Sequence, residues 1–206
     1  MDADAVDALS RFDADLARRT ISADARLDQL QRDIEDKVVL TIARRQPLAL
    51  DLRMLMGSIR IANDLERIGD MAKSIAKRSI KIAEDSRAPR ALVGIRRMAE
   101  IVGVQLKDVL DAYARLEVDR ADQVWSRDFE VDALEDAVFR DLLTFMMEDP
   151  RNISFCTHLL FCSKNLERIG DHATNIAEMV HYLVTGQSLP VDRPRGGAEA
   201  PITKVA

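Results

Sequence analysis

The sequence predicts an all-α protein made of two tandem three-helix bundles related by an internal repeat, with the first helix of the first bundle truncated. Three observations support this fold class. The string Leu-Glu-Arg-Ile-Gly-Asp occurs twice, at residues 65–70 and 166–171. Apolar residues recur at steps of three and four, the spacing of one helix face. Glycine (8 of 206 residues), proline (6) and aromatic residues (4%) are scarce, a composition that favours helix.

Three helices are expected in the first bundle, residues 1–85. Residues 1–20 carry apolar side chains at helical spacing and predict one or two short helices. A longer helix is expected over 22–45, with Ser22 as its N-cap. Its apolar face is predicted to comprise Leu27, Leu30, Ile34 and Val38.

The third helix of this bundle is expected to run from Pro47 to about Ala83, because proline suits the first turn of a helix. Residues 84–90 interrupt the apolar pattern and are expected to mark the boundary between the halves. The packing seam of this helix is predicted to comprise Leu65, Ile68, Ala72, Ile75, Ser79 and Ile82.

The second bundle is expected over residues 88–186, with helices over 90–117 and 119–148 and a last helix opened by Asp149-Pro150. Residues 187–206 lack periodicity and are predicted to form a flexible tail. The last helix repeats the seam of the first half, with Leu166, Ile169, Ala173, Ile176, Val180 and Leu183.

The repeat reveals a difference between the two halves. Thirty-eight residues separate Arg90 from Asp128, whereas only 23 precede the matching Asp24. At 3.6 residues per turn, the first helix is therefore expected to be short by about four turns. Either the first bundle leaves apolar surface exposed, or a partner chain covers it. A misplaced start of the chain would produce the same difference.

Composition and charge limit the possible partners and compartments. The 30 Lys and Arg and 35 Asp and Glu are mixed along the chain, so no basic stripe predicts a nucleic-acid partner. No apolar run approaches the ~18 residues of a membrane helix, and the start does not resemble a signal peptide. Cys156 and Cys162 lie about 9 Å apart along the predicted helix, too far for a disulfide, and are expected to be reduced core thiols. We therefore predict a soluble, cytoplasmic protein.

Paired carboxylates are the main candidates for a functional site. Each copy of the repeated string holds Glu and Asp four residues apart, hence on one helix face and off the apolar seam. An Asp pair with the same spacing lies on the preceding helix of each half, and it too is expected outside the apolar face of its helix. Asp28 and Glu66 each lie 19 residues from Pro47, so an antiparallel hairpin places them at the same height. In the second half, Asp132 lies 18 residues before Pro150 and Glu167 lies 17 after it, which predicts the same register. The two sets expected to converge are Asp24, Asp28, Glu66 and Asp70 in the first half and Asp128, Asp132, Glu167 and Asp171 in the second.

These eight carboxylates are predicted to be metal ligands. Like charges four residues apart weaken a helix by about 0.2–0.5 kcal/mol, so a compensating cation is expected. Clustered oxygen ligands without Cys or His suit Mg²⁺, Mn²⁺ or Fe, with one or more ions in each cluster. Ordinary solvated helix faces are the alternative. His172 is a candidate neighbour of the ligands, and Glu178-x-x-His181 is interpreted as a surface pair. No nucleophile or phosphate-binding motif predicts an enzyme.

Five segments, in this order, resemble the PhoU family. The resemblance spans about residues 5–186, and the duplicated Glu-Arg-Ile-Gly-Asp is specific to that family. The sequence departs from the family at its N-terminus, where members have a longer first helix. The segments are Arg45-Gln46-Pro47, Asp51-Leu52-Arg53, Asp64-Leu65-Glu66-Arg67-Ile68-Gly69-Asp70, Phe145-Met146-Met147-Glu148-Asp149 and Asn165-Leu166-Glu167-Arg168-Ile169-Gly170-Asp171.

The resemblance implies two pseudo-twofold-related bundles that carry metal clusters on their surface, with the two carboxylate sets above as ligands. It also implies an accessory regulator of the phosphate-specific ABC transporter. Such a protein would couple the transporter ATPase subunit to the phosphate-sensing histidine kinase and hold the phosphate-starvation response off when phosphate is plentiful. We expect a homodimer that reaches the membrane only through these partners. A carboxylate-bridged di-metal enzyme and a metal-free helical scaffold are the alternative functions.

Overall fold

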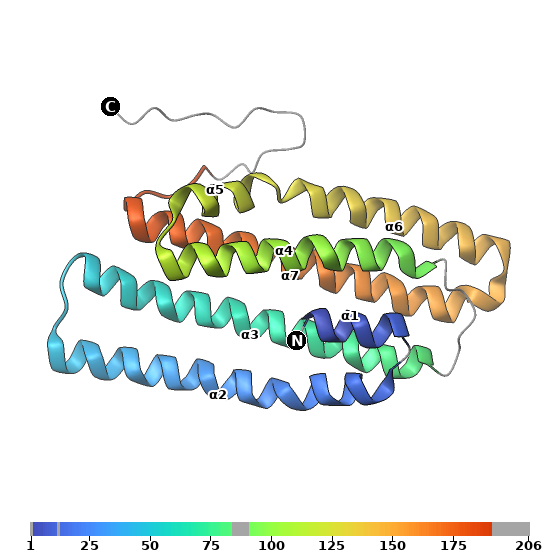
Figure 1. Ribbon diagram of the computed structural model, residues 1–206, viewed down its shortest axis with the longest axis horizontal. Helices are drawn as coiled ribbons and strands as arrows, with labels where there is room; N and C mark the ends of the chain where they lie inside the picture. The colour runs from blue at the N-terminus through green and yellow to red at the C-terminus, as the bar shows by residue number, and fades with distance from the viewer. Residues whose placement is uncertain (1, 12, 84–90, 191–206) are drawn as a thin grey trace.

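The computed structural model describes residues 2–11, 13–83 and 91–190, and within them it contains helices and no strands (Figure 1). A 3₁₀ turn, η2 (Pro150–Asn152), precedes the last helix. The α-helices are α1 (Asp2–Arg11), α2 (Ala14–Arg45), α3 (Leu50–Ala83), α4 (Leu92–Arg115), α5 (Val118–Ser126), α6 (Phe129–Glu148) and α7 (Ile153–Thr185).

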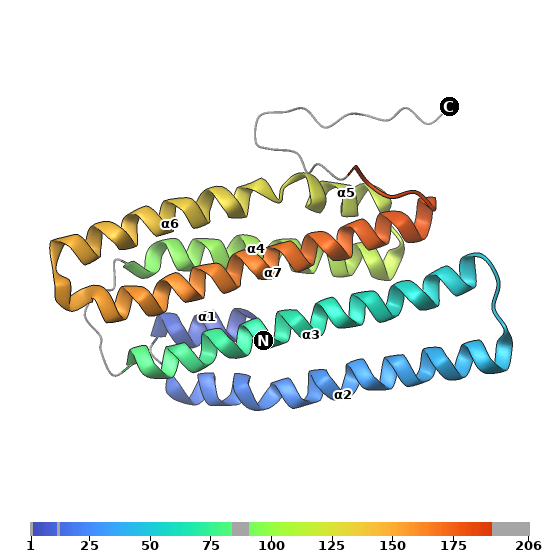
Figure 2. The ribbon, with the colours of Figure 1, turned by 180° about the vertical axis from the view of Figure 1, so that it is seen from behind.

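Two antiparallel helix hairpins pack against each other. Helices α2 and α3 form the first hairpin, and α6 and α7 form the second; α3 and α7 meet at the centre (Figures 1 and 2). Side-chain contacts pair Arg53 with Tyr182 near one end of α3 and Arg78 with Phe161 near the other, so α3 and α7 run antiparallel. Helices α4 and α5 cover α7, while α1 packs on α2, α3 and α4. The all-helical, repeated architecture agrees with the prediction.

The predicted seams form the core between these helices. All six seam residues of α7, from Leu166 to Leu183, have no exposed surface. In α3, Ile68, Ala72, Ile75, Ser79 and Ile82 are at most 5% exposed, whereas Leu65 is only half-buried. Both cysteines are buried free thiols, as expected, and burial raises the pKa of Cys162 to about 12.

Helix α2 begins earlier than predicted. Its N-cap is Asp13, whose Oδ1 accepts hydrogen bonds from the backbone N–H groups of Asp15 (3.0 Å) and Leu16 (2.9 Å). An aspartate satisfies these otherwise unpaired N–H groups as well as a serine does. The prediction of Ser22 as N-cap is therefore wrong: its hydroxyl donates to the carbonyl of Arg19 within the helix.

The single helix predicted over 119–148 is two helices, α5 and α6. The chain leaves helical geometry at Arg127, where φ is −102° and ψ is 8°. The side-chain amide of Gln105, a buried residue of α4, donates to the carbonyl oxygen of Arg127 at 3.2 Å. The same carbonyl also accepts from the backbone N–H of Glu130 at 3.1 Å, so the break between the two helices is accompanied by one local and one tertiary hydrogen bond, and local periodicity does not encode the second.

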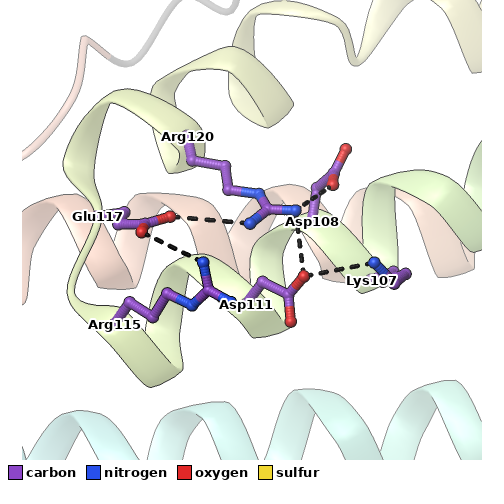
Figure 3. A network of polar contacts seen from close by, with 6 residues as sticks. All are labelled: Lys107, Asp108, Asp111, Arg115, Glu117 and Arg120. Carbon is purple, nitrogen blue, oxygen red and sulfur yellow. Dashed lines mark hydrogen bonds and ion pairs between the residues drawn. The ribbon is translucent and has the colours of Figure 1, made fainter.

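Charged side chains fasten α5 to α4 (Figure 3). The Arg120 guanidinium of α5 donates to Asp108 (2.8 Å) and Asp111 (3.0 Å), both on α4. In the connection between the helices, Glu117 forms ion pairs with Arg120 and with Arg115, each at 3.7 Å. The Arg120 guanidinium, shared by two carboxylates of α4, thereby links α5 to that helix.

Helix α1 is much shorter than its counterpart in the second half, as expected from the repeat. It has 10 residues, and α4 has 24. Figure 1 shows α1 beside only one end of the α2–α3 hairpin, the end remote from the 46–49 turn. Toward that turn, an apolar groove between α2 and α3, lined in part by Val38, Leu55 and Leu65, remains open to solvent.

Several expectations fall at the edges of the described chain. Phe12 and the boundary at 84–90 lie outside the described residues, as do residues 191–206 of the predicted tail. Leu189 packs against the core, so the described start of that tail is attached to the bundle. None of the described helices is long and apolar enough to cross a lipid bilayer.

Candidate functional site

The register predicted for each hairpin is confirmed by direct contacts. In the first hairpin, the Gln31 amide on α2 donates to Asn63 on α3 at 2.7 Å, and Lys73 on α3 contacts Asp24 on α2. In the second hairpin, the Thr174 hydroxyl on α7 donates to Asp128 at 2.8 Å. Asp24 and Asp28 therefore face the Glu-x-x-x-Asp pair of α3, and Asp128 and Asp132 face that of α7.

Asp24 is buried in the helix interface, and its predicted position outside the buried face of its helix is wrong. The residue is 3% exposed, whereas Leu30, predicted on the buried face, is 49% exposed. The buried stripe of α2 passes through Ala17, Thr20, Asp24 and Val38. Asp128, the equivalent residue in the second half, is also buried, at 7% exposed. Each set thus contains one buried carboxylate, Asp24 or Asp128, and its other members lie nearer the surface.

Lys73 is the compensating cation in the first set. Its ammonium forms an ion pair with Asp24 and lies 3.8 Å from Asp70, on the same helix. The Asp24 side chain is 5% exposed and that of Lys73 29% exposed, so the pair is partly shielded from water. The hydrogen bond to Asp24, together with the charges of Asp24, Asp70 and Asp28, raises the pKa of Lys73. The ammonium therefore stays charged at neutral pH.

Glu66 lies beside these carboxylates, and their charges affect its pKa. Burial raises its pKa, and the charges of Asp70 and Asp28 raise it further, while Arg67 lowers it. Arg67 lies 3.6 Å from Glu66 and 4.0 Å from Asp70, with its own side chain 63% exposed. At that exposure the pairs with Arg67 contribute little, so Lys73 dominates the neutralisation of this set.

The glycine of the first repeated string permits close approach of α2 and α3. A Cβ added at Gly69 would lie 2.5 Å from the Leu27 side chain and 3.8 Å from Asp24 Oδ1. At the equivalent Gly170, the nearest atom, from Val131, would lie at 3.5 Å, an ordinary contact. The missing side chain at Gly69 thus leaves room for the end of the Leu27 side chain, whereas a Cβ at Gly170 would make only ordinary contacts.

The second set has no lysine at its centre. The position that matches Lys73 holds Thr174, whose neutral hydroxyl donates to Asp128 at 2.8 Å and to the Gly170 carbonyl at 3.1 Å. Lys164 pairs with Glu167 Oε1 at 2.8 Å from the rim, with its side chain 57% exposed. The other oxygen of Glu167, Oε2, is buried and has no hydrogen-bond partner among the described residues.

The carboxylates of the second set repel one another. Partial desolvation raises the pKa of Asp132, although the residue is exposed; the charges of Asp128, Asp171 and Glu167 add to the rise, and Lys164 opposes it. A raised carboxyl pKa means that the folded state disfavours the charged form relative to the unfolded chain. The three carboxylates that raise the pKa of Asp132 are the other three members of the predicted second set.

Asp132→Asn should raise the free energy of unfolding at pH 7 in the presence of a chelator. Because the folded pKa of Asp132 lies above the ordinary value of 3.8, its charge lowers stability as pH rises through the folded pKa, and the penalty vanishes below 3.8. The gain over wild type should therefore grow from pH 4 to pH 7 in urea denaturation. Asp136→Asn, an exposed position on α6, controls for the loss of one charge. A gain that shrinks with pH would contradict this arrangement.

The second set fits a hard cation in its chemistry, but neither set is assembled as a finished site. All donors are carboxylate or hydroxyl oxygens, which Mg²⁺, Mn²⁺ and Fe accept, and the unpaired Glu167 Oε2 offers a buried ligand atom. Within the described part of the chain, however, no three acidic, His or Cys side chains lie at distances that would hold an ion. Metal ligation by the eight carboxylates stays a prediction.

Both histidines that the sequence analysis considered have structural partners. His172 Nδ1 lies 2.8 Å from Asp64 on α3, across the central interface. Asp64 is not a member of either carboxylate set. His181 Nδ1 lies 2.7 Å from Asp122 on α5, a partner that the expected surface pair of Glu178 and His181 does not include. Both contacts join α7 to another helix, which spacing along one helix cannot predict.

Sequence reasoning missed Lys73, Lys164 and Thr174. The signal was present in the repeat: Lys73 and Thr174 are 101 positions apart, the same offset as the two strings. Lys73 also lies three residues after Asp70, and Lys164 three residues before Glu167, spacings at which helix neighbours meet. Comparing the two copies for charge differences would have found them.

Several known proteins resemble this chain in sequence and fold, and they share one family. The family model described as "PhoU domain" matches residues 1–79 and 95–180. The chain is 55% identical, over 95% of its length and 82% of the relative's, to the phosphate-specific transport system accessory protein PhoU homolog of Rhizobium meliloti (strain 1021). The corresponding homolog of Caulobacter vibrioides (strain NA1000 / CB15N) is 51% identical, over 94% of this chain and 84% of that protein.

Solved structures give the same result. PhoU from Pseudomonas aeruginosa superposes with a TM-score of 0.87 at 42% identity, covering 90% of this chain and 89% of that one. The phosphate transport system regulatory protein PhoU from Streptococcus pneumoniae gives a TM-score of 0.83 at 27% identity, over 92% and 89%. The repeated helical fold and the sequence match together establish that the chain belongs to the PhoU family, a family of accessory and regulatory proteins and not of enzymes.

Proposed function

We propose that this protein regulates phosphate uptake and keeps the phosphate-starvation response off when phosphate is plentiful. The observation that carries the proposal is the 55% identity, over 95% of the chain, to a phosphate-specific transport system accessory protein homolog. The protein acts in the cytoplasm as an adaptor between the ATPase subunit of the phosphate ABC transporter and a phosphate-sensing histidine kinase. It acts as a homodimer and reaches the membrane only through these partners.

Metal binding is the second part of the proposal. Asp24, Asp28, Glu66 and Asp70 would hold one site, and the equivalent carboxylates of the second half the other. The four carboxylates of each set come from two helices of one hairpin, and in each set desolvation and neighbouring carboxylates together raise the pKa of at least one member. A bound Mg²⁺, Mn²⁺ or Fe ion would supply the positive charge that relieves this repulsion. The carboxylates would thereby tie the helices of a hairpin together.

Deletion of the gene in its source cell tests the regulatory part. Phosphate-starvation genes, followed with a phosphatase reporter, should be expressed at high phosphate in the deletion strain and silent again when the wild-type protein is restored. Unchanged expression in the deletion strain would refute the regulatory role. Complementation with Glu167→Ala/Asp171→Ala, compared with Asp136→Ala/Asp141→Ala on exposed positions of α6, then asks whether the carboxylates serve that role.

Elemental analysis of the purified protein tests the metal part. Mg, Mn or Fe should copurify with the wild-type protein, and the double variants Glu66→Ala/Asp70→Ala and Glu167→Ala/Asp171→Ala should report how much each set contributes. The Asp136→Ala/Asp141→Ala variant should retain the wild-type content. If the wild-type protein contains no metal and added metal does not change its melting temperature, the metal part is refuted and the metal-free helical scaffold is the remaining alternative.

A further inference from the structure

We propose that Arg78 and Lys81 on α3, together with His158 on α7, form a binding site for a phosphate group, carried either by inorganic phosphate or by a small phosphomonoester. The site lies where the end of α3 meets the start of α7 (Figures 1 and 2) and includes none of the paired carboxylates. This inference goes beyond the proposed function, which assigns the protein no anion-binding site, and it requires no bound metal.

Arg78 spans the interface between the two hairpins. Its Nη1 lies 3.4 Å from Nδ1 of His158, and its guanidinium stacks on the Phe161 ring, 4.0 Å from the centroid. Both partners belong to α7. The stack holds the plane of the guanidinium against the ring, so the N–H groups at its edge have defined directions.

The guanidinium of Arg78 lacks an oxygen acceptor within the described part of the chain. Its Nε is buried there without a hydrogen-bond partner, and its single polar contact is with a ring nitrogen. A buried donor without an acceptor is unfavourable, so an oxygen atom supplied from outside the chain would stabilise this arrangement. The planar fork of an arginine accommodates two oxygens of a phosphate group side by side.

Arg53 shows how the chain satisfies a stacked arginine near the other end of the same two helices. Its guanidinium lies 5.3 Å from the centroid of the Tyr182 ring, and its Nη1 donates to the carbonyl oxygen of Tyr182 at 3.5 Å. Arg78 has the aromatic partner without such an oxygen. This difference between two otherwise similar contacts indicates an acceptor that comes from a ligand.

The charges around His158 favour an anion with two negative charges. Burial lowers the pKa of His158, and the charges of Arg78 and Lys81 lower it further. Two cations beside a ring that can itself take up a proton attract a phosphate dianion more strongly than a single carboxylate. Lys81 is exposed and Phe161 is 51% exposed, so a ligand can reach this place from solvent.

Isothermal titration of the chelator-treated chain with inorganic phosphate tests the site. Arg78→Met should weaken binding at least tenfold. Arg53→Met is the matched control, because it removes a stacked arginine from the same helix, and it should leave the dissociation constant within twofold. Circular dichroism checks folding, and Lys81→Met, at an exposed position, should weaken binding at least threefold even if Arg78→Met does not fold. Equal losses at Arg78 and Arg53, or no phosphate binding by the wild-type protein, would overturn the inference.

Anions of different charge and shape identify the ligand. At equal ionic strength, inorganic phosphate should bind at least tenfold more tightly than acetate, and it should raise the pKa of His158 in an NMR titration, because a nearby anion favours the charged ring. Competition by glycerol 3-phosphate would assign the site to the phosphate group of either source, and its absence to the free anion. Acetate that binds as tightly as phosphate would overturn the inference. Deletion of the gene and elemental analysis test the proposed function separately.

Discussion

Leu166→Ala is expected to lower the free energy of unfolding by about 2–5 kcal/mol, the range for truncating a fully buried leucine. Leu166 opens the second repeated string and has no exposed surface. It belongs to α7, which α3, α4, α5 and α6 all contact. Neighbouring helices on every side leave little freedom to collapse into the cavity, so the loss should fall in the upper part of the range.

Leu65 provides a matched control, because it opens the first repeated string. It is half-buried, and it lines the open groove between α2 and α3. Leu65→Ala should therefore cost less, about 1–2 kcal/mol, since part of its surface is already in water. Urea denaturation of both variants measures the difference. Equal losses would contradict the unequal cover of the two hairpins.

Lys73→Met is expected to lower the free energy of unfolding by about 3 kcal/mol in the presence of a chelator. Removing one partner of a buried ion pair leaves the other charge uncompensated, at a cost of about 3–5 kcal/mol. The lower end applies because the Lys73 side chain is 29% exposed. Methionine keeps most of the volume of the side chain, so the loss reports on the charge and not on a cavity.

Lys164→Met is the corresponding variant in the second set. Its pair with Glu167 lies at the rim, with the lysine 57% exposed, so the loss should be below about 1 kcal/mol. Chemical denaturation at pH 7, with chelator throughout, compares the two variants under conditions where bound metal cannot contribute. Similar losses at both positions would show that Lys73 is no more than another surface lysine.

Much of the fold could be predicted because helix periodicity and duplication are local signals. The seams of α3 and α7 were predicted to within one partly exposed residue, Leu65, because a step of three or four positions fixes which side of a helix a residue occupies. The register of each hairpin followed from counting residues on both sides of Pro47 and Pro150. Both signals depend only on distances along the chain.

The predictions that were wrong or missing concern contacts between segments that are distant along the chain. Asp24 and Asp28 are alike in residue type and lie on the same helix, and the packing of other helices against α2 makes the first of them buried. The break between α5 and α6 is accompanied by a hydrogen bond from Gln105, 22 positions away from Arg127. His172 and His181 likewise take partners from other helices. Each of these features requires two segments that are distant in sequence to be placed in space.

The candidate site also combines features that local sequence predicts with features that require the tertiary structure. The sequence by itself determined the two sets of four carboxylates and their place on facing helices, because duplication and helical spacing are written in the order of residues. Only the tertiary structure decided that Lys73 lies against Asp24 while Thr174 lies against Asp128. The physical reason is that electrostatic compensation depends on distances of a few ångströms across a helix interface, and neither composition nor periodicity specifies these distances.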